Sequence, residues 1–160
     1  MIEIRQFNPA DQNGVIDVIL PIQQREFGIA ITAEDQPDLR DIPGFYQNGK
    51  GGFWVALYQN TVVGTLGLKD IGDDQGALRK MFVSAAYRGS QYQVAAQLLD
   101  ALLLHASRRR IRGIFLGTTD KFLAAHRFYR KHGFAELPKT ALPAGFPIMA
   151  VDSLFFSKSL

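Results

Sequence analysis

One amphipathic stretch constrains the fold of this chain more than any other feature. Between residues 94 and 106, apolar side chains recur at helical spacing, which predicts a long helix with one buried face. The members of this stripe are Val94, Ala95, Leu98, Leu99, Leu102, Leu103 and Ala106. Strand-like apolar segments lie on either side, near residues 76–83 and 114–117. Because a long helix connects them, we expect these two strands to pair in parallel through a crossover.

The remaining apolar segments predict further strands of the same sheet. FWVALY and VVGTLGL, joined by the tight turn at Gln59-Asn60, are typical of a hairpin. Other expected strands lie at the start of the chain up to Phe7, near residues 134–137 and over residues 151–158.

Two more helical patterns accompany these strands. The first covers residues 15–27, and Pro21 is expected to interrupt it. The second covers residues 121–132, with Asp120 as its expected N-cap and Gly133 just beyond its end. The order of elements predicts an α/β (α+β) fold with a mixed, mostly antiparallel sheet, one parallel βαβ crossover and helices on both faces.

Length and composition limit the classes of protein to consider. The 160 residues suffice for one domain with a real core, so we expect a single domain over residues 1–160. The chain is 47% hydrophobic and 21% charged, which excludes a disordered protein. No apolar run approaches the roughly 20 residues that span a bilayer. We therefore expect a cytoplasmic protein with no membrane partner.

Side-chain chemistry excludes several kinds of site. The chain has no cysteine, and its three histidines are scattered, so we expect no disulfide, no cysteine nucleophile and no metal site.

The charges are unevenly distributed along the chain. Residues 1–78 hold 5 Lys and Arg against 11 Asp and Glu, whereas residues 79–132 hold 11 against 2. The basic part suits a polyanion, either a nucleic acid or a small ligand with several phosphates, and the acidic part suits a cation such as an amine. Two solvated faces of opposite bias would explain the same counts.

Two segments carry a family resemblance. MFVSAAYRGSQYQVAAQLLDALLLHA followed by IFLGTTDKFLAAHRFYRKHGF resembles the GNAT superfamily of acyl-CoA-dependent N-acetyltransferases, with its strand–loop–helix and strand–helix motifs. The resemblance implies the GNAT fold, with acetyl-CoA as cosubstrate and an amine as acceptor.

The first motif implies a cosubstrate site. Backbone N–H groups at the start of the long helix attract a pyrophosphate, Arg88 adds a charge-assisted contact, and Gly89 permits close approach. The implied binding residues are Met81, Phe82, Val83, Arg88, Gly89, Ser90, Gln91, Tyr92, Gln93, Val94, Ala95 and Ala125. The sequence departs from the family pattern where Gln93 stands at a glycine position, so the loop is either longer or differently wound.

The second motif implies a catalytic tyrosine. Tyr129 corresponds to the family residue whose hydroxyl faces the thioester sulfur, where a hydrogen bond stabilises the departing thiolate. The usual asparagine is replaced by Phe122, and Thr118 or Thr119 is a candidate for its polar contact. A lone helical histidine such as His126 is more often structural.

The proton acceptor for the amine is left open. The expected strand over 76–83 contains no glutamate, which many relatives use there. Glu26, Asp70 and a chain of waters are the alternatives.

The sequence therefore predicts an N-acetyltransferase that moves an acetyl group from acetyl-CoA to a primary amine by direct attack in a ternary complex. The acceptor is either a small molecule or a protein amino group. The first alternative is a non-catalytic acyl-CoA-binding regulatory module. A second, nucleic-acid binding through the cluster from Arg108 to Arg112, is disfavoured. Whether the chain forms a homodimer is left open.

Overall fold

A seven-stranded sheet organises the computed structural model, which describes residues 1–160. Its strands follow the spatial order β1-β2-β3-β4-β5-β7-β6, and every neighbouring pair is antiparallel except β4 and β5. The strands are β1 (Ile2–Gln6), β2 (Gly52–Tyr58), β3 (Thr61–Gly72), β4 (Gln75–Val83), β5 (Gly113–Thr118), β6 (Ala135–Leu137) and β7 (Leu154–Ser159). The predicted mixed sheet with one parallel crossover is confirmed.

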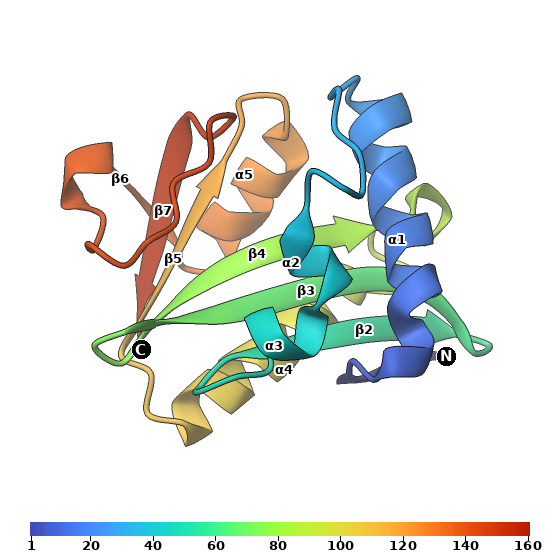
Figure 1. Ribbon diagram of the computed structural model, residues 1–160, viewed down its shortest axis with the longest axis horizontal. Helices are drawn as coiled ribbons and strands as arrows, with labels where there is room; N and C mark the ends of the chain where they lie inside the picture. The colour runs from blue at the N-terminus through green and yellow to red at the C-terminus, as the bar shows by residue number, and fades with distance from the viewer.

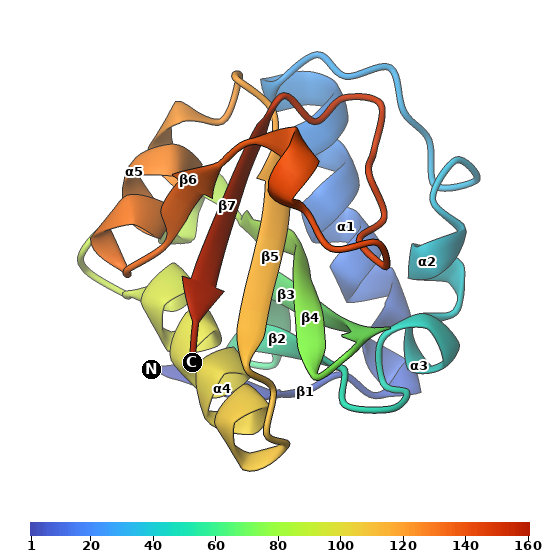
Figure 2. The same cartoon turned by 90° about the vertical axis from the view of Figure 1, so that its left-hand side faces the viewer.

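Helices cover both faces of this sheet, as predicted. α1 (Gln12–Pro21) crosses one face and α4 (Val94–Arg108) crosses the other, as the two views in Figures 1 and 2 show. The other helices are α2 (Pro37–Arg40), α3 (Ile42–Phe45), α5 (Leu123–Lys131), the 3-10 turns η1 (Pro9–Asp11), η3 (Ala85–Tyr87) and η4 (Lys139–Ala141), and the π-helical turn η2 (Ile22–Glu26). None of them combines the length and apolar character that crossing a bilayer requires.

Each helical layer buries its own apolar cluster. Leu98, Leu99 and Leu102 of α4 are fully buried against one face, as the leucine stripe predicted. On the other face, Val15 and Ile19 of α1 pack with residues of α2, α3 and β2. The sheet is therefore held from both sides.

The parallel pairing between β4 and β5 is short, and it leaves a gap between the two strands. Only Gln75–Ala77 pairs with Gly113–Phe115, and beyond these residues the two strands diverge (Figure 1). A bulge accompanies the divergence: Lys80 has a φ of +57°, and its carbonyl accepts a hydrogen bond of 2.7 Å from the Thr65 hydroxyl. The strands therefore form a wedge that opens toward the start of α4.

The α-helix ends at Pro21 and a second helical stretch of different geometry reaches Phe27, as expected from the sequence. α1 includes Pro21, and the chain continues as the π-helical turn η2, in which the Phe27 N–H donates to the Ile22 carbonyl at 3.1 Å. Proline lacks an N–H and its ring crowds the preceding turn, which weakens the α-helix at the point where the π-helical turn takes over.

The start of α5 also differs from the expectation. Asp120 is not its N-cap, because α5 begins at Leu123 after Phe122, which provides no side-chain cap. The Asp120 carboxylate accepts a hydrogen bond from the hydroxyl of Thr119 instead, and that hydroxyl accepts one from the Lys121 N–H. The end of α5 agrees with the prediction, since Gly133 has a φ of +88° directly after His132.

The last strand begins later than expected. β7 starts at Leu154, so Asp152 lies in the loop that precedes it. This shift places a carboxylate beside the wedge.

Candidate active site

A cavity of about 740 Å³ occupies the wedge between β4 and β5. Its walls come from η2, β4, the start of α4, the end of β5, α5 and the loop before β7. It has two chemically different ends. The end at the start of α4 is where the resemblance implies the cosubstrate, and we call it the cosubstrate half; the end beside Arg79 and Lys80, which would then face an acceptor, we call the acceptor half.

The cosubstrate half is built from the loop and first turn that the resemblance pointed to. Arg88, Gly89, Ser90, Gln93, Val94 and Ala95 line the cavity, together with Ala96, which the sequence reasoning missed. The first N–H groups of a helix have no partner within it, so the start of α4 presents main-chain donors to the cavity. Gln93, at the family's glycine position, has a φ of +54°, which is the left-handed conformation that glycine adopts readily.

Two of the predicted binding residues do not line the cavity. Gln91 is exposed, and the Tyr92 ring packs against Tyr58 and Tyr87 at centroid distances of 5.8 and 5.2 Å. Positive φ angles at Gly89 (+93°) and Gln93 bend the loop there, and of the residues between them Ser90 lines the cavity whereas Gln91 and Tyr92 do not.

Arg88 lies at the edge of the cavity, with protein partners. Its Nη1 donates to Glu26 Oε2 at 2.6 Å, and its Nε donates to the Val83 carbonyl at 2.8 Å. The carboxylate of Glu26, one of the candidate bases, is therefore used in an ion pair with Arg88.

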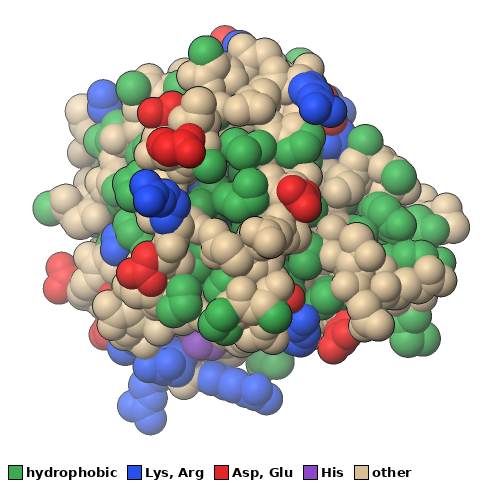
Figure 3. Space-filling model, turned by 45° about the vertical axis from the view of Figure 1, so that its right-hand side comes forward, with side chains coloured by type: hydrophobic (Ala, Val, Ile, Leu, Met, Phe, Trp, Pro, Cys, Tyr) green, Lys and Arg blue, Asp and Glu red, His purple; other side chains and the backbone are tan.

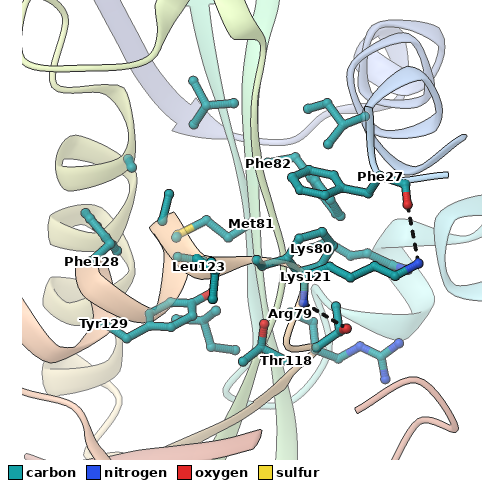
Figure 4. A pocket seen from close by; sticks show the side chains of 18 of the residues that line it. Phe27, Arg79, Lys80, Met81, Phe82, Thr118, Lys121, Leu123, Phe128 and Tyr129 are labelled. Carbon is teal, nitrogen blue, oxygen red and sulfur yellow. Dashed lines mark hydrogen bonds between the residues drawn. The ribbon is translucent and has the colours of Figure 1, made fainter. Parts of the chain in front are cut away.

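The strand and helix that flank the wedge hold the other predicted residues. Met81, Phe82 and Val83 line it from β4, and Ala125 and Tyr129 line it from α5. In Figure 4 the Tyr129 hydroxyl points into the cavity from α5, toward Met81.

The environment of Tyr129 makes it a hydrogen-bond donor rather than an acid. The residue is only 6% exposed, and burial raises the pKa of its phenol well above the usual value, with no hydrogen bond contributing. The Tyr129 hydroxyl that faces the cavity is therefore protonated and neutral at every physiological pH.

Neighbouring residues of the second motif have structural contacts. His126 is buried, and its Nε2 lies 2.8 Å from the Thr119 carbonyl, which agrees with the structural role expected for it. Phe122, at the family's asparagine position, packs edge-to-face on Phe27 with a centroid distance of 4.5 Å. Thr118 and Thr119 both line the cavity.

The acceptor half contains buried charges that the sequence reasoning missed. The side chains of Arg79 and Lys80 are only 13% and 11% exposed, and both line the cavity. Asp38 lies behind them, with its Oδ2 3.9 Å from Arg79 Nη2 and 3.7 Å from Lys80 Nζ. Burial lowers the pKa of Lys80, and the nearby Asp38 carboxylate opposes this effect. The available signal was two adjacent cations in an otherwise apolar strand.

Asp152 is a second missed residue. It lines the cavity from the loop before β7, and burial raises the pKa of its carboxyl group, against the opposing effects of the Met149 N–H, Arg79 and Lys80. Asp70, a candidate base from sequence, does not line the cavity, and its carboxylate accepts the N–H groups of Lys50 and Gly72, each at 2.9 Å.

The acidic part of the chain (residues 1–78) and the basic part (residues 79–132) contact each other in the fold. Acids of the first part pair with bases of the second, as in Glu26 with Arg88. Arg109 and Arg112 donate to main-chain carbonyls of Gly49 and Asp73. On the face drawn in Figure 3, acidic and basic side chains are interspersed, and basic ones gather mainly at its lower edge. No group of three or more acidic or histidine side chains is arranged to hold a metal ion.

A comparison with protein families identifies the relationship. The sequence profile of the Acetyltransferase (GNAT) family matches residues 16–134. The chain belongs to the GNAT family. This family consists of acyl-CoA-dependent acetyltransferases, and the wedge, the α4 start and Tyr129 all fall within the matched residues.

Solved GNAT structures resemble this chain over its full length. An acetyltransferase of the GNAT family from Staphylococcus aureus Mu50 is 39% identical, with a TM-score of 0.94 and coverage of 99% of both chains. An acetyltransferase from Streptococcus agalactiae is 31% identical, with a TM-score of 0.93 and coverage of 99% of this chain and 98% of the other. A Thermoplasma acidophilum N-acetyltransferase solved in complex with coenzyme A shares the fold at 17% identity, with a TM-score of 0.73 and coverage of 100% and 99%.

Curated relatives match a smaller part of their own length. An N-acetylaspartate synthetase from Danio rerio is 33% identical over 124 residues, which are 74% of this chain and 43% of that protein. A probable N-acetyltransferase 14 from Xenopus tropicalis is 31% identical over 121 residues, 74% of this chain and 58% of that protein. The chain thus spans about half the length of these relatives.

Proposed function

We propose that this GNAT protein transfers an acetyl group from acetyl-CoA to a primary amine by direct attack in a ternary complex. Residues 1–160 act in this proposal as one catalytic domain. The observation that carries it is a single cavity that joins the main-chain donors at the start of α4 to the Tyr129 hydroxyl in the β4–β5 wedge.

Acetyl-CoA binds with its pyrophosphate at the start of α4 and its pantetheine arm along β4. Val94, Ala95 and Ala96 contribute N–H groups to the phosphates. Beyond Ala77 the edge of β4 that faces β5 has no strand partner, so main-chain groups of Met81 and Val83 are placed to bond the arm.

The chemistry follows from the side chains around the wedge. The amine nitrogen attacks the thioester carbonyl carbon, a C–N bond forms, and the nitrogen loses its extra proton to solvent. The C–S bond breaks with the electron pair leaving on sulfur. Tyr129 donates a hydrogen bond to that sulfur as negative charge develops on it. The product thiolate takes up a proton from solvent, since a thiol has a lower pKa than a phenol.

An alkylammonium must lose a proton before it attacks, because its pKa lies well above neutral pH. Asp152 replaces Glu26 and Asp70 as the candidate acceptor of this proton, since its carboxylate lines the cavity without the ion pair that Glu26 makes, and burial raises its pKa. A chain of waters to solvent is the alternative.

A small molecule is favoured over a protein amino group as acceptor. Several curated relatives, including the Danio rerio protein, are named for making N-acetylaspartate, an acetylated small amine.

A cytoplasmic location and the assembly state stay predictions from the sequence.

A non-catalytic acyl-CoA-binding module is the second candidate. The ion pair between Arg88 and Glu26, together with Gln93 at a glycine position, favours it. Nucleic-acid binding has weaker support, since Arg109 and Arg112 already bond main-chain carbonyls.

Calorimetry and a turnover assay test the proposal in sequence. Titrating coenzyme A into the folded protein should release or absorb heat with one-site stoichiometry. Mixing acetyl-CoA with a panel of primary amines should then release free thiol only when an acceptor is present. Binding without turnover on any amine would favour the regulatory module, and absence of binding would reject both.

A further inference from the structure

The buried cations of the acceptor half are arranged in two layers. Lys80 and Arg79 line the cavity, whereas Asp38 and Gln36 lie behind them and do not line it. Lys80 Nζ donates to Gln36 Oε1 at 2.6 Å. Asp38 and Gln36 therefore contact the two cations from the protein interior, and the opposite side of each cation faces the cavity.

The two cations share a single ion-pair partner, and the Asp152 carboxyl, farther away, also favours the charged form of Lys80. One carboxylate, Asp38, serves both cations at 3.7 and 3.9 Å, and its Oδ2 also accepts a hydrogen bond of 2.5 Å from the Tyr46 hydroxyl. An ammonium group has three donors, of which Lys80 uses one in its hydrogen bond to Gln36, while Asp38 is an ion-pair partner at 3.7 Å. A buried cation with a free donor is costly unless an anion completes its coordination.

A third cation extends the same side of the cavity. In Figure 4 the Lys121 and Lys80 side chains both extend across the cavity in the direction away from Tyr129. Lys121 lines the cavity, and its Nζ lies 3.5 Å from the Phe27 carbonyl. The proposed acetyl transfer takes place beside Tyr129. The positive side chains thus lie on the opposite side of the cavity.

We propose that the acceptor is an amino acid-like molecule whose carboxylate binds Lys80, with Arg79 behind it, while its amine faces the thioester. This inference rests on the proposed function, because it assigns the acceptor of that same cavity. Asp152 completes the complementarity, since its carboxylate lies on the same cavity and suits the ammonium of such a zwitterion.

The same charges disfavour other acceptor classes. A polyamine or an aminoglycoside would bring additional cations toward Lys80 and Arg79, and like charges repel strongly in a buried site. A protein N-terminus carries an amide where an amino acid carries a carboxylate, so it offers Lys80 no counter-charge.

Matched pairs of acceptors test the carboxylate directly. The probes are free L-amino acids and their α-carboxamides, which have the same side chain and differ in this charge and in the basicity of the amine. The measurement is kcat/KM from release of free coenzyme A. The carboxamide has the less basic amine, so its intrinsic reactivity at neutral pH is the higher of the two. We expect at least one acid to be preferred over its carboxamide by about tenfold or more, the size expected for one charge-assisted contact.

Variants of Lys80 separate recognition from folding. Lys80→Met should lower kcat/KM for the acid by about tenfold or more and leave the carboxamide within about twofold, because it removes only the charged contact. Lys80→Arg should restore part of the preference. Lys139→Met, at an exposed lysine outside the cavity, is the control and should change neither value.

Three results would overturn the inference. They are equal or better turnover of carboxamides by the wild-type protein, an equal loss on both probes in Lys80→Met, and a preference for acceptors without any acid group. In each case amine acetylation itself would stand. Failure of the proposed function is a different result, namely absence of thiol release with every amine.

Discussion

The two halves of the cavity offer different chemical groups to a ligand. At the start of α4 the available groups are mainly main-chain N–H donors and small or apolar side chains, such as Gly89, Val94 and Ala95. Beside β4 the available groups are buried charged side chains, Arg79, Lys80 and Asp152. A main-chain N–H at a helix start is kept when the residue is substituted, whereas a charged group is lost with its side chain. The fold therefore supplies the cosubstrate half, and individual residues supply the acceptor half.

Removal of the Tyr129 hydroxyl is expected to have the largest effect. Tyr129→Phe should lower kcat by about 100-fold, the loss typical when one donor to a developing negative charge is removed. Affinity for coenzyme A should stay the same in calorimetry, because the ring and its packing remain. Tyr92→Phe, whose ring packs outside the cavity, is the control and should retain full activity. Equal activity of Tyr129→Phe and wild type would exclude the hydroxyl from the reaction.

A charge placed at the start of α4 sharpens the comparison between main-chain and side-chain recognition. Ala96→Glu should weaken coenzyme A binding by about tenfold or more through repulsion of the phosphates. The same change should stabilise the free protein slightly, since an acidic side chain in the first turn favours the helix dipole by about 0.3–1 kcal/mol. Ala96→Gln, of the same size without the charge, is the control. Calorimetry gives the Kd for coenzyme A, and thermal unfolding gives the Tm of the free protein. A Kd that does not rise in Ala96→Glu relative to Ala96→Gln, while Tm rises, would contradict the predicted phosphate position.

Arg88 should contribute less than the main chain. Arg88→Gln should raise the Kd for coenzyme A by about three- to tenfold, because the loop keeps its N–H groups when one charged contact is lost. Arg5→Gln removes a comparable ion pair, with Asp11 at 2.7 Å, from outside the cavity and should leave the Kd unchanged. A loss of all binding in Arg88→Gln would show that side chains dominate this half as well.

The smallest expected effect concerns the stability of the free protein. Burial raises the pKa of Asp152, so the folded state binds its proton more tightly than the unfolded state, and the ionised carboxylate destabilises the fold at neutral pH. Asp152→Asn should therefore raise Tm at pH 7, and the gain should vanish as pH falls below the usual carboxyl pKa.

Asp70 provides a control of opposite sign for that measurement. Its pKa is lowered by hydrogen bonds from the Lys50 and Gly72 N–H groups, so its ionised form stabilises the fold. Asp70→Asn should lower Tm at pH 7, and this loss should also fade in acid. Thermal unfolding at several pH values checks both variants, and the same sign for both would contradict the assignment for Asp152.

The same contrast explains what could be predicted from sequence. The leucine stripe of α4 and the apolar segments on either side predicted the crossover, because periodic burial and the length of the connection leave few topologies. The wedge position of Met81 and Val83 followed from the family resemblance.

The acceptor half could not be predicted in the same way. Asp38 and Gln36 come from the segment between α1 and β2, where no periodic pattern reveals which residues reach β4. The sequence of β4 shows that the strand has no carboxylate of its own, but it does not show that Arg79 and Lys80 line a cavity with Asp38 behind them. The position of Asp120 before a helical pattern predicted an N-cap, but α5 begins at Leu123 and the Asp120 carboxylate accepts a hydrogen bond from the Thr119 hydroxyl.

The brevity of the β4–β5 ladder has a consequence for how the molecule responds to its cosubstrate. Strands β1 to β4 and strands β5 to β7 meet within the sheet through three register pairs only. A ligand bonded along the wedge would link these two groups of strands and supply hydrogen bonds that the protein itself lacks there. Amide hydrogens near Phe82 and Leu116 should therefore exchange with solvent more slowly when coenzyme A is present, even though neither residue changes its place in the fold.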